Sequence, residues 1–129
     1  MSIIIEEAKK IVAGIDFSQL QDKRVLVTGA SGLIGIYMVA CLKELKTKYN
    51  IEIFIWLNSG IEPQFKDILT DCVYIVGDMT DSNHYYLKSN DSFDFIIHLA
   101  GYGQPNKFLN NKAKTISLNT TGTLNLLAN

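Results

Sequence analysis

The most informative segment of the chain reads Val25-Leu-Val-Thr-Gly-Ala-Ser-Gly-Leu-Ile-Gly35. Its first four residues are apolar or β-branched, which favours a strand, and the residues from Ile34 to Tyr49 follow with helical spacing. Glycines at positions 29, 32 and 35 therefore stand between a strand and a helix. The first permits a tight turn, the second admits a ligand close to the backbone, and the third lets the helix pack near the sheet.

A turn of this kind brings the N-terminus of the helix, with its free N–H groups and partial positive charge, to a bound phosphate. We therefore predict a dinucleotide-binding site on this turn, and the alternative is a glycine turn that serves packing alone. The phosphate loop of nucleotide triphosphatases is excluded, because it needs Gly-Lys-Ser/Thr at its end. Here Gly35 is followed by Ile36-Tyr37.

The rest of the chain alternates between strand and helix patterns. Apolar or β-branched runs predict strands at residues 23–28, 51–57, 72–76 and 93–99, and the second should be buried on both faces. Helical spacing predicts helices at 3–13, 34–49, 64–69, 81–88 and 110–128. In the helix at 34–49, we expect one apolar side made of Tyr37, Met38, Cys41, Leu42 and Leu45.

Strands separated by helices indicate a parallel sheet with right-handed crossovers. We predict an α/β half-Rossmann fold with helices on both faces and the strand order 3-2-1-4. Residues 1–22 would form an N-terminal helix and a lead-in, and residues 23–129 an incomplete NAD(P)-binding domain. We expect the chain to stop before a fifth strand, without its catalytic and substrate-binding part, and to self-associate as a homo-oligomer through the apolar surface left exposed.

Composition narrows the function classes. The 129 residues carry a net charge of −1, from 12 basic and 13 acidic residues, so neither nucleic acid nor a membrane surface is an expected partner. Cys41 and Cys72 lie in apolar stretches without metal-ligand spacing, which indicates reduced core thiols and no metal site. Without a signal peptide or a spanning segment, we expect a cytoplasmic protein.

Four segments, in this order, resemble the extended short-chain dehydrogenase/reductases, the group that contains nucleotide-sugar epimerases, dehydratases and decarboxylases. The matching segments are Thr28-Gly-Ala-Ser-Gly-Leu-Ile-Gly35, Val76-Gly-Asp-Met79, Asp94-Phe-Ile-Ile-His-Leu-Ala-Gly101 and Thr115-Ile-Ser-Leu-Asn-Thr-Thr-Gly-Thr-Leu-Asn125. The resemblance covers about residues 21–129, and four ordered motifs are far more specific than one.

The resemblance implies a set of cofactor contacts. It assigns the phosphates to the glycine turn, the adenosine ribose to the end of the second strand, the adenine to the turn after the third strand, and the nicotinamide side to the fourth. The residues are Gly29, Ser31, Gly32, Leu33, Ile34 and Gly35; Asn58; Asp78 and Met79; Leu99, Ala100 and Gly101; and Asn119 on the last helix. The loop with Tyr102, Gln104 and Pro105 would also lie near the nicotinamide and the sugar.

Two departures from the family pattern matter. Members that prefer NAD carry an acidic residue at the end of the second strand, whereas this chain has Asn58 followed by Ser59. NAD is favoured because no lysine or arginine is near, and NADP remains the alternative. The family's catalytic Tyr-x-x-x-Lys pair is absent, since none of the six tyrosines has a lysine four positions later. We therefore expect no catalytic residue in this chain and no activity from it alone.

The resemblance implies that the whole protein removes a hydride from a nucleotide-sugar substrate with bound NAD, epimerises or dehydrates the sugar, and returns the hydride. The alternatives are a stand-alone nucleotide-sensing module and a carbonyl reductase of the same superfamily. Three other features have ordinary interpretations. We expect His98 to be packed and hydrogen-bonded, Asp91 and Asp94 to hold turns, and Lys107, Lys112 and Lys114 to form a solvated face.

Overall fold

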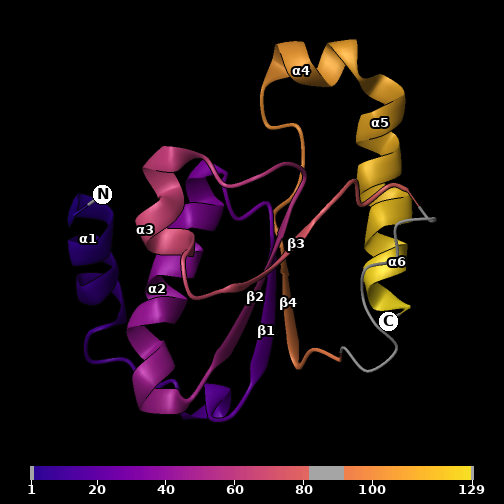
Figure 1. Cartoon of the computed structure of the whole chain (residues 1–129). Coiled ribbons are helices and arrows are strands. Elements are labelled where there is room, and N and C mark those ends of the chain that lie inside the picture. The colour runs from indigo at the N-terminus through magenta and orange to yellow at the C-terminus, as the bar shows by residue number, and fades with distance from the viewer. Residues whose placement is uncertain (1, 82–91, 129) are drawn as a thin grey trace.

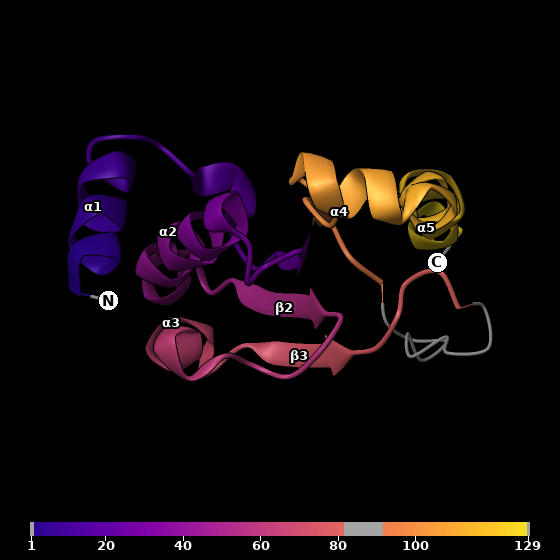
Figure 2. The same cartoon turned by 90° about the horizontal axis from the view of Figure 1, so that it is seen from above.

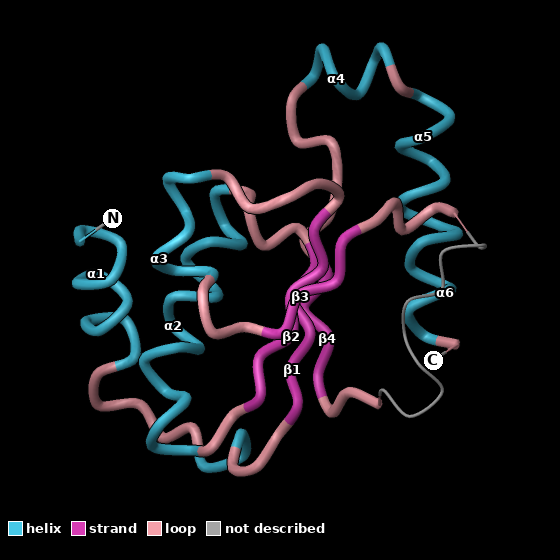
Figure 3. The backbone as a smooth tube through the Cα atoms, viewed as in Figure 1, coloured by secondary structure: helices cyan, strands magenta, loops and turns pink. Residues whose placement is uncertain are grey.

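The computed structural model describes residues 2–81 and 92–128, which form three layers with a sheet in the middle (Figure 1). The sheet contains the parallel strands β1 (Arg24–Thr28), β2 (Glu52–Leu57), β3 (Val73–Val76) and β4 (Phe95–His98). Their order is β3-β2-β1-β4, which confirms the predicted topology. Because every pair is parallel, all four strands end at the same edge of the sheet, and the loops that leave this edge lie together (Figure 3).

Helices cover the two faces of the sheet (Figure 2). On one face α2 (Leu33–Tyr49) and the short α3 (Lys66–Leu69) pack on the strands, and α1 (Ser2–Val12) lies against the outer side of α2. On the other side of the sheet lie α5 (Lys112–Ser117) and α6 (Thr123–Leu127), whereas α4 (Pro105–Asn110) lies beyond the carboxyl ends of the strands. The predicted helix at residues 81–88 lies almost entirely outside the described residues.

Alternating side chains of the central strands build a core on each face. Val25, Val27 and Ile55 face α2, whereas Leu26 and Trp56 face the last helices. All residues of β2 after Glu52 are buried, which confirms the expectation that this strand is covered on both faces. Complete burial of a Leu or Ile side chain contributes roughly 1.5–3 kcal/mol, so these central strands anchor the turns that follow them.

The apolar side expected of α2 is only partly correct. Leu42 and Leu45 are buried as expected, but Tyr37, Met38 and Cys41 are only half-buried along the flank of the helix. The sheet instead buries a neighbouring stripe of the helix, formed by Ile36, Val39 and Ala40. The helix is apolar on more than one side because α1 also packs on it, where the Tyr37 hydroxyl donates a 2.5 Å hydrogen bond to Glu7.

The continuous helix expected at residues 110–128 is interrupted in the structure. Asn111 separates α4 from α5, and residues Leu118–Gly122 form a π-helical turn between α5 and α6. The hydroxyl of Thr120 donates to the Ile116 carbonyl at 2.7 Å, and that of Thr123 donates to the Asn119 carbonyl at 3.0 Å. Such side-chain bonds compete with the regular helical pattern, which explains why spacing alone missed the irregular turn.

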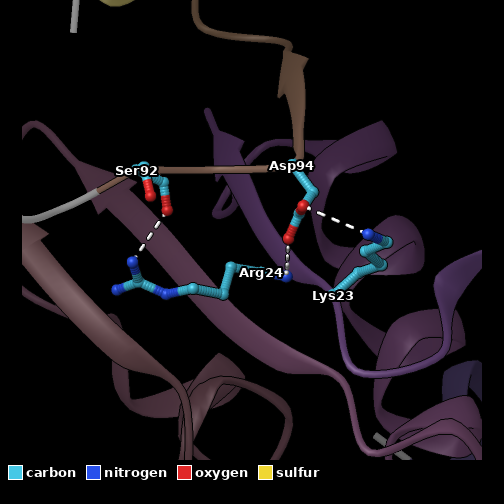
Figure 4. Close-up of polar contacts among 4 residues, drawn as sticks. All are labelled: Lys23, Arg24, Ser92 and Asp94. Carbon is cyan, nitrogen blue, oxygen red and sulfur yellow. Dashed lines mark hydrogen bonds and ion pairs between the residues drawn. The ribbon is translucent and has the colours of Figure 1, made fainter.

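The amino ends of β1 and β4 are joined by charged groups (Figure 4). The Asp94 carboxylate accepts the backbone N–H of Arg24 at 2.8 Å and pairs with the Lys23 ammonium at 3.4 Å. Arg24 donates to the Ser92 carbonyl at 2.8 Å and to Glu52 at 3.1 Å. The Asp94 side chain therefore joins the amino ends of two neighbouring strands, at the edge of the sheet opposite the carboxyl ends, and the expectation that it holds its own turn is wrong. Asp91 lies outside the described residues.

Candidate functional site

A cavity of about 350 Å³ lies at the carboxyl ends of the strands, where open parallel sheets bind their ligands. Its walls come from the turns after all four strands and from α5. The lining residues are Gly29, Ser31, Gly32, Trp56, Leu57, Asn58, Asp78, Met79, Thr80, Leu99, Ala100, Gly101, Tyr102, Lys114 and Leu118. Segments up to 89 positions apart in the sequence, from Gly29 to Leu118, thus meet around one space.

The glycine turn is closely packed by backbone alone. Gly29 has a φ of +66°, and a Cβ atom there would lie 2.6 Å from the carbonyl carbon and oxygen of Leu99. A Cβ atom at Gly35 would lie 2.1 Å from the Gly29 carbonyl oxygen and 2.8 Å from Ala30 Cα. Only glycine therefore lets this turn touch both the start of α2 and the turn after β4.

The backbone at the start of α2 has the character of an anion site. The helix begins at Leu33 with Gly32 as its N-cap, and no side chain caps it. Its first N–H groups therefore have no partner within the helix and supply partial positive charge at this end. Ser31 and Gly32 bring this end of the helix to the cavity, which fits a pyrophosphate.

The turns after β2 and β3 are tied to each other. The Trp56 indole N–H donates to the Gly77 carbonyl at 3.0 Å. One carboxylate oxygen of Asp78 accepts the Thr80 backbone N–H at 2.9 Å and the Thr80 hydroxyl at 2.7 Å. The Trp56 bond holds the start of the Asp78–Met79 turn against the end of β2, and the Asp78 bonds hold its shape.

Thr28 and His98 end the paired strands β1 and β4. The buried Thr28 hydroxyl lies 2.6 Å from His98 Nδ1 and accepts the backbone N–H groups of Leu99 at 3.1 Å and Ala100 at 3.2 Å. His98 is thus packed and hydrogen-bonded, as expected from the sequence. Burial lowers the pKa of His98, which favours its neutral form.

The structure brings together most of the residues expected to bind the cofactor. Nine line the cavity: Gly29, Ser31, Gly32, Asn58, Asp78, Met79, Leu99, Ala100 and Gly101. Four do not line it: Leu33, Ile34, Gly35 and Asn119. Gly35 packs beneath the glycine turn, and the Leu33 and Ile34 side chains are exposed, with Ile34 on a separate apolar groove. Asn119 Oδ1 lies 3.9 Å from the point where Gly101 would carry a Cβ atom.

The cavity also contains residues that the sequence did not assign to it. Trp56, Leu57, Thr80 and Leu118 contribute to its walls, and Lys114 contributes a positive charge. Lys114 is exposed, as expected of a solvated residue, but it reaches the cavity because the α4–α5 segment folds back toward the sheet. Neither its spacing nor its neighbours in sequence signalled this placement.

The expectation that both cysteines lie in the core is correct for Cys72 and not for Cys41. Both are free thiols, with Cys72 buried and Cys41 half-buried. Burial raises the pKa of each thiol, which keeps it protonated and unreactive. Within residues 2–81 and 92–128, no helix has the length and apolar character to cross a bilayer.

Sequence comparison identifies related proteins. Residues 25–129 match the NAD dependent epimerase/dehydratase family. The chain is 30% identical over 114 residues to the bifunctional UDP-glucose 4-epimerase and UDP-xylose 4-epimerase 3 of Arabidopsis thaliana. That alignment covers 81% of this chain and 32% of the plant protein.

Solved structures share the fold. The L-threonine dehydrogenase of Clostridium difficile matches with a TM-score of 0.59 and 25% identity, over 80% of this chain and 31% of that one. An epimerase from Methanothermobacter thermautotrophicus matches with a TM-score of 0.66 and 23% identity, over 98% of this chain and 34% of that one. The chain therefore spans about a third of the length of each of these proteins.

Proposed function

Because the chain belongs to the NAD dependent epimerase/dehydratase family, whose pattern it matches over residues 25–129, we propose that it binds NAD in the cavity at the carboxyl ends of its strands. The observation that carries this proposal is the meeting of the glycine turn, the Asp78–Met79 turn and the Leu99–Gly101 turn around one cavity. A dinucleotide is long enough to contact all three turns at once. A glycine turn that serves packing alone would not require the other two turns to meet it around a cavity.

The chemistry of each wall fits one part of the cofactor. The uncapped start of α2 supplies N–H groups and positive potential for the pyrophosphate. Asp78 and Met79 offer a carboxylate and an apolar side chain for the adenine, and Asn58 offers an amide for the ribose hydroxyls. Leu99, Ala100 and Gly101 are small or apolar, and they leave room for a flat ring beside β4.

We propose that the whole protein is a nucleotide-sugar epimerase or dehydratase, in which this chain holds the cofactor. The Arabidopsis relative is a UDP-glucose and UDP-xylose 4-epimerase, which supports a nucleotide-activated sugar as substrate. NAD, when bound, accepts a hydride from the substrate and returns it. The residues present would orient the cofactor, and the sequence lacks the Tyr-x-x-x-Lys pair that the family resemblance implies for moving the sugar's proton.

NAD is the favoured cofactor on the basis of charge. Asn58 and the exposed Ser59 offer hydrogen bonds to ribose hydroxyls, and neither carries the positive charge that would hold the additional phosphate of NADP. Among the described residues that line the cavity, the positively charged one is Lys114, which lies on α5 and not at the end of β2.

A dehydrogenase that releases reduced cofactor after each turnover is the second candidate. The similarity to the L-threonine dehydrogenase of Clostridium difficile favours it, because that protein shares the fold at 25% identity. The two candidates predict the same cofactor site, and they differ in whether reduced cofactor accumulates in solution during turnover of the whole protein.

Titration of the chain with NAD by calorimetry tests the proposal. We expect saturable binding with one site per chain, and Ser31→Glu should weaken it at least tenfold, because it places a negative charge where the pyrophosphate would lie. An acidic residue next to the start of α2 favours the helix, so the loss should not arise from unfolding. Gln19→Glu makes the same change of charge in an exposed turn at the amino end of β1 and should bind NAD normally.

Two outcomes would reject the proposal: no NAD binding by the folded chain, or equal binding by Ser31→Glu and Gln19→Glu. A chain that binds NAD but turns over UDP-glucose unaided would instead contradict the expectation that this chain alone is inactive.

A further inference from the structure

The arrangement around the Thr28 hydroxyl determines where its proton lies. Three nitrogen atoms approach the oxygen: Leu99 N at 3.1 Å, Ala100 N at 3.2 Å and His98 Nδ1 at 2.6 Å. A hydroxyl has one proton and two lone pairs. The two backbone groups only donate, so they occupy both lone pairs, and the proton is left for His98.

We propose that Thr28 and His98 form a positioning pair, in which the Thr28 hydroxyl donates to His98 Nδ1 and thereby holds the ring as the neutral Nε2–H tautomer. The opposite tautomer would place three donors on an oxygen with two lone pairs and leave the hydroxyl proton without an acceptor. The doubly protonated ring fails in the same way.

The number of buried hydrogen-bonding groups left without a partner also favours the Nε2–H tautomer. His98 Nε2 is enclosed and lacks a hydrogen-bond partner among the residues that the structure describes. The Nε2–H tautomer therefore leaves one donor unpaired. The Nδ1–H tautomer leaves both the Nε2 lone pair and the Thr28 proton unsatisfied, and it crowds three donors around one oxygen. Burial lowers the pKa of His98, which opposes the charged ring independently.

The pair acts on the cofactor site because each of its residues directly precedes a turn that lines the cavity. Thr28 precedes Gly29, the first residue of the glycine turn, and His98 precedes the Leu99–Gly101 turn. Leu99 N–H also donates to the Thr28 carbonyl at 3.2 Å, so backbone and hydroxyl together hold the second turn against the first. The Thr28 hydroxyl thus helps to hold the turn after β4 beside the glycine turn.

Nitrogen NMR of the wild-type chain tests the tautomer without any cofactor. The chain has two histidines, so His84→Gln identifies the His98 signals. At pH 7.5 we expect long-range proton–nitrogen correlations of a neutral ring with the proton on Nε2. A proton on Nδ1, or a charged ring, would overturn the proposal.

The positioning role is tested by amide exchange and by cofactor binding. Thr28→Val keeps the shape of the side chain and removes the hydroxyl, so the Ala100 amide should exchange about tenfold faster and NAD should bind about tenfold more weakly. Thr28→Ser restores the hydroxyl and should stay within about twofold of wild type in both measurements. Thr70→Val removes an exposed hydroxyl at the end of α3 that bonds to the Lys66 carbonyl, away from the cavity, and should change neither.

The functional part of this inference rests on NAD binding, and the two can fail separately. A chain that shows the Nε2–H tautomer and the Ala100 effect but binds no NAD would reject the proposed function and keep the pair. A chain that binds NAD equally well with Thr28→Val, and protects Ala100 equally, would reject the positioning role and keep the proposed function.

Discussion

Replacing Gly29 by alanine tests whether the glycine turn is held by close contact with the turn after β4. Two separate penalties should apply. Alanine at a φ of +66° is strained by about 1–2 kcal/mol. In addition, the new Cβ atom would lie 2.6 Å from the Leu99 carbonyl and 2.7 Å from Ala100 N, which are backbone atoms and cannot rotate away.

Relief of that contact requires the two turns to separate. Overpacking of this kind destabilises proteins by about 1–3 kcal/mol. With the backbone strain, the expected loss in the free energy of unfolding is roughly 2–5 kcal/mol. At roughly 4 °C per kcal/mol for a domain of this size, the melting temperature should fall by about 8–20 °C.

Two other glycines separate the contributions. Gly14 has a φ of +74° with nothing within 4 Å of the new Cβ atom, so Gly14→Ala should show the backbone strain alone, about 1–2 kcal/mol. Gly60 also faces open space, and its φ is not positive, so Gly60→Ala should be neutral or stabilising by about 0.4–1 kcal/mol.

Urea unfolding followed by circular dichroism measures all three variants on the same scale. We expect Gly29→Ala to be less stable than Gly14→Ala by more than about 1 kcal/mol. If the two variants lose the same free energy, the close approach of the turns after β1 and β4 does not constrain the fold, and the cavity walls are not held in the way inferred from the structure.

Three further predictions address charge and exposed apolar surface. Asn58→Asp should raise the preference for NAD over NADP about tenfold, because a carboxylate repels the additional phosphate; an unchanged ratio in parallel titrations would remove Asn58 from the ribose site. The pKa of Asp94 is lowered, chiefly by the Arg24 backbone N–H and then by Lys23, so the ionised carboxylate stabilises the fold at neutral pH and this contribution declines from about pH 5 downward. The free energy of unfolding should therefore fall less steeply with decreasing pH in Asp94→Asn than in wild type, and equal slopes would contradict this. The chain should self-associate through the edge strand β4, where Ile96 is exposed, so Ile96→Lys should sediment as smaller species than wild type. Equal sedimentation of the two would show that β4 is not the associating surface.

The features that the sequence predicted best are those that depend on short segments. The strand and helix on either side of the glycine turn, the parallel sheet and its order all follow from local periodicity and from the rule that parallel strands need crossover connections. The glycine turn could also be predicted from a short segment, because the positive φ at Gly29 and the close contact at Gly35 both require glycine.

The features that the sequence did not predict depend on local side-chain bonds or on contacts between distant segments. The π-helical turn at Leu118–Gly122 replaces regular helix, and the hydroxyls of Thr120 within it and Thr123 directly after it bond to carbonyls that a helix would otherwise use. Tyr37 was predicted to lie on the apolar side of its helix, but it is half-buried and its hydroxyl bonds to Glu7 on α1. Hydrophobicity identifies a residue that avoids water, and it does not identify which neighbour covers it.

The α/β class, the family and most of the residues around the cavity can be read from the amino-acid sequence, because glycine, small and apolar residues at fixed spacing encode the backbone of a nucleotide-binding turn. The placement of Lys114 in the cavity wall, the exclusion of Leu33 and Ile34 from it, and the contact of Thr28 with His98 across two strands required the folded chain. A turn is specified by a few consecutive residues, whereas a hydrogen bond across strands depends on the register that the whole sheet imposes.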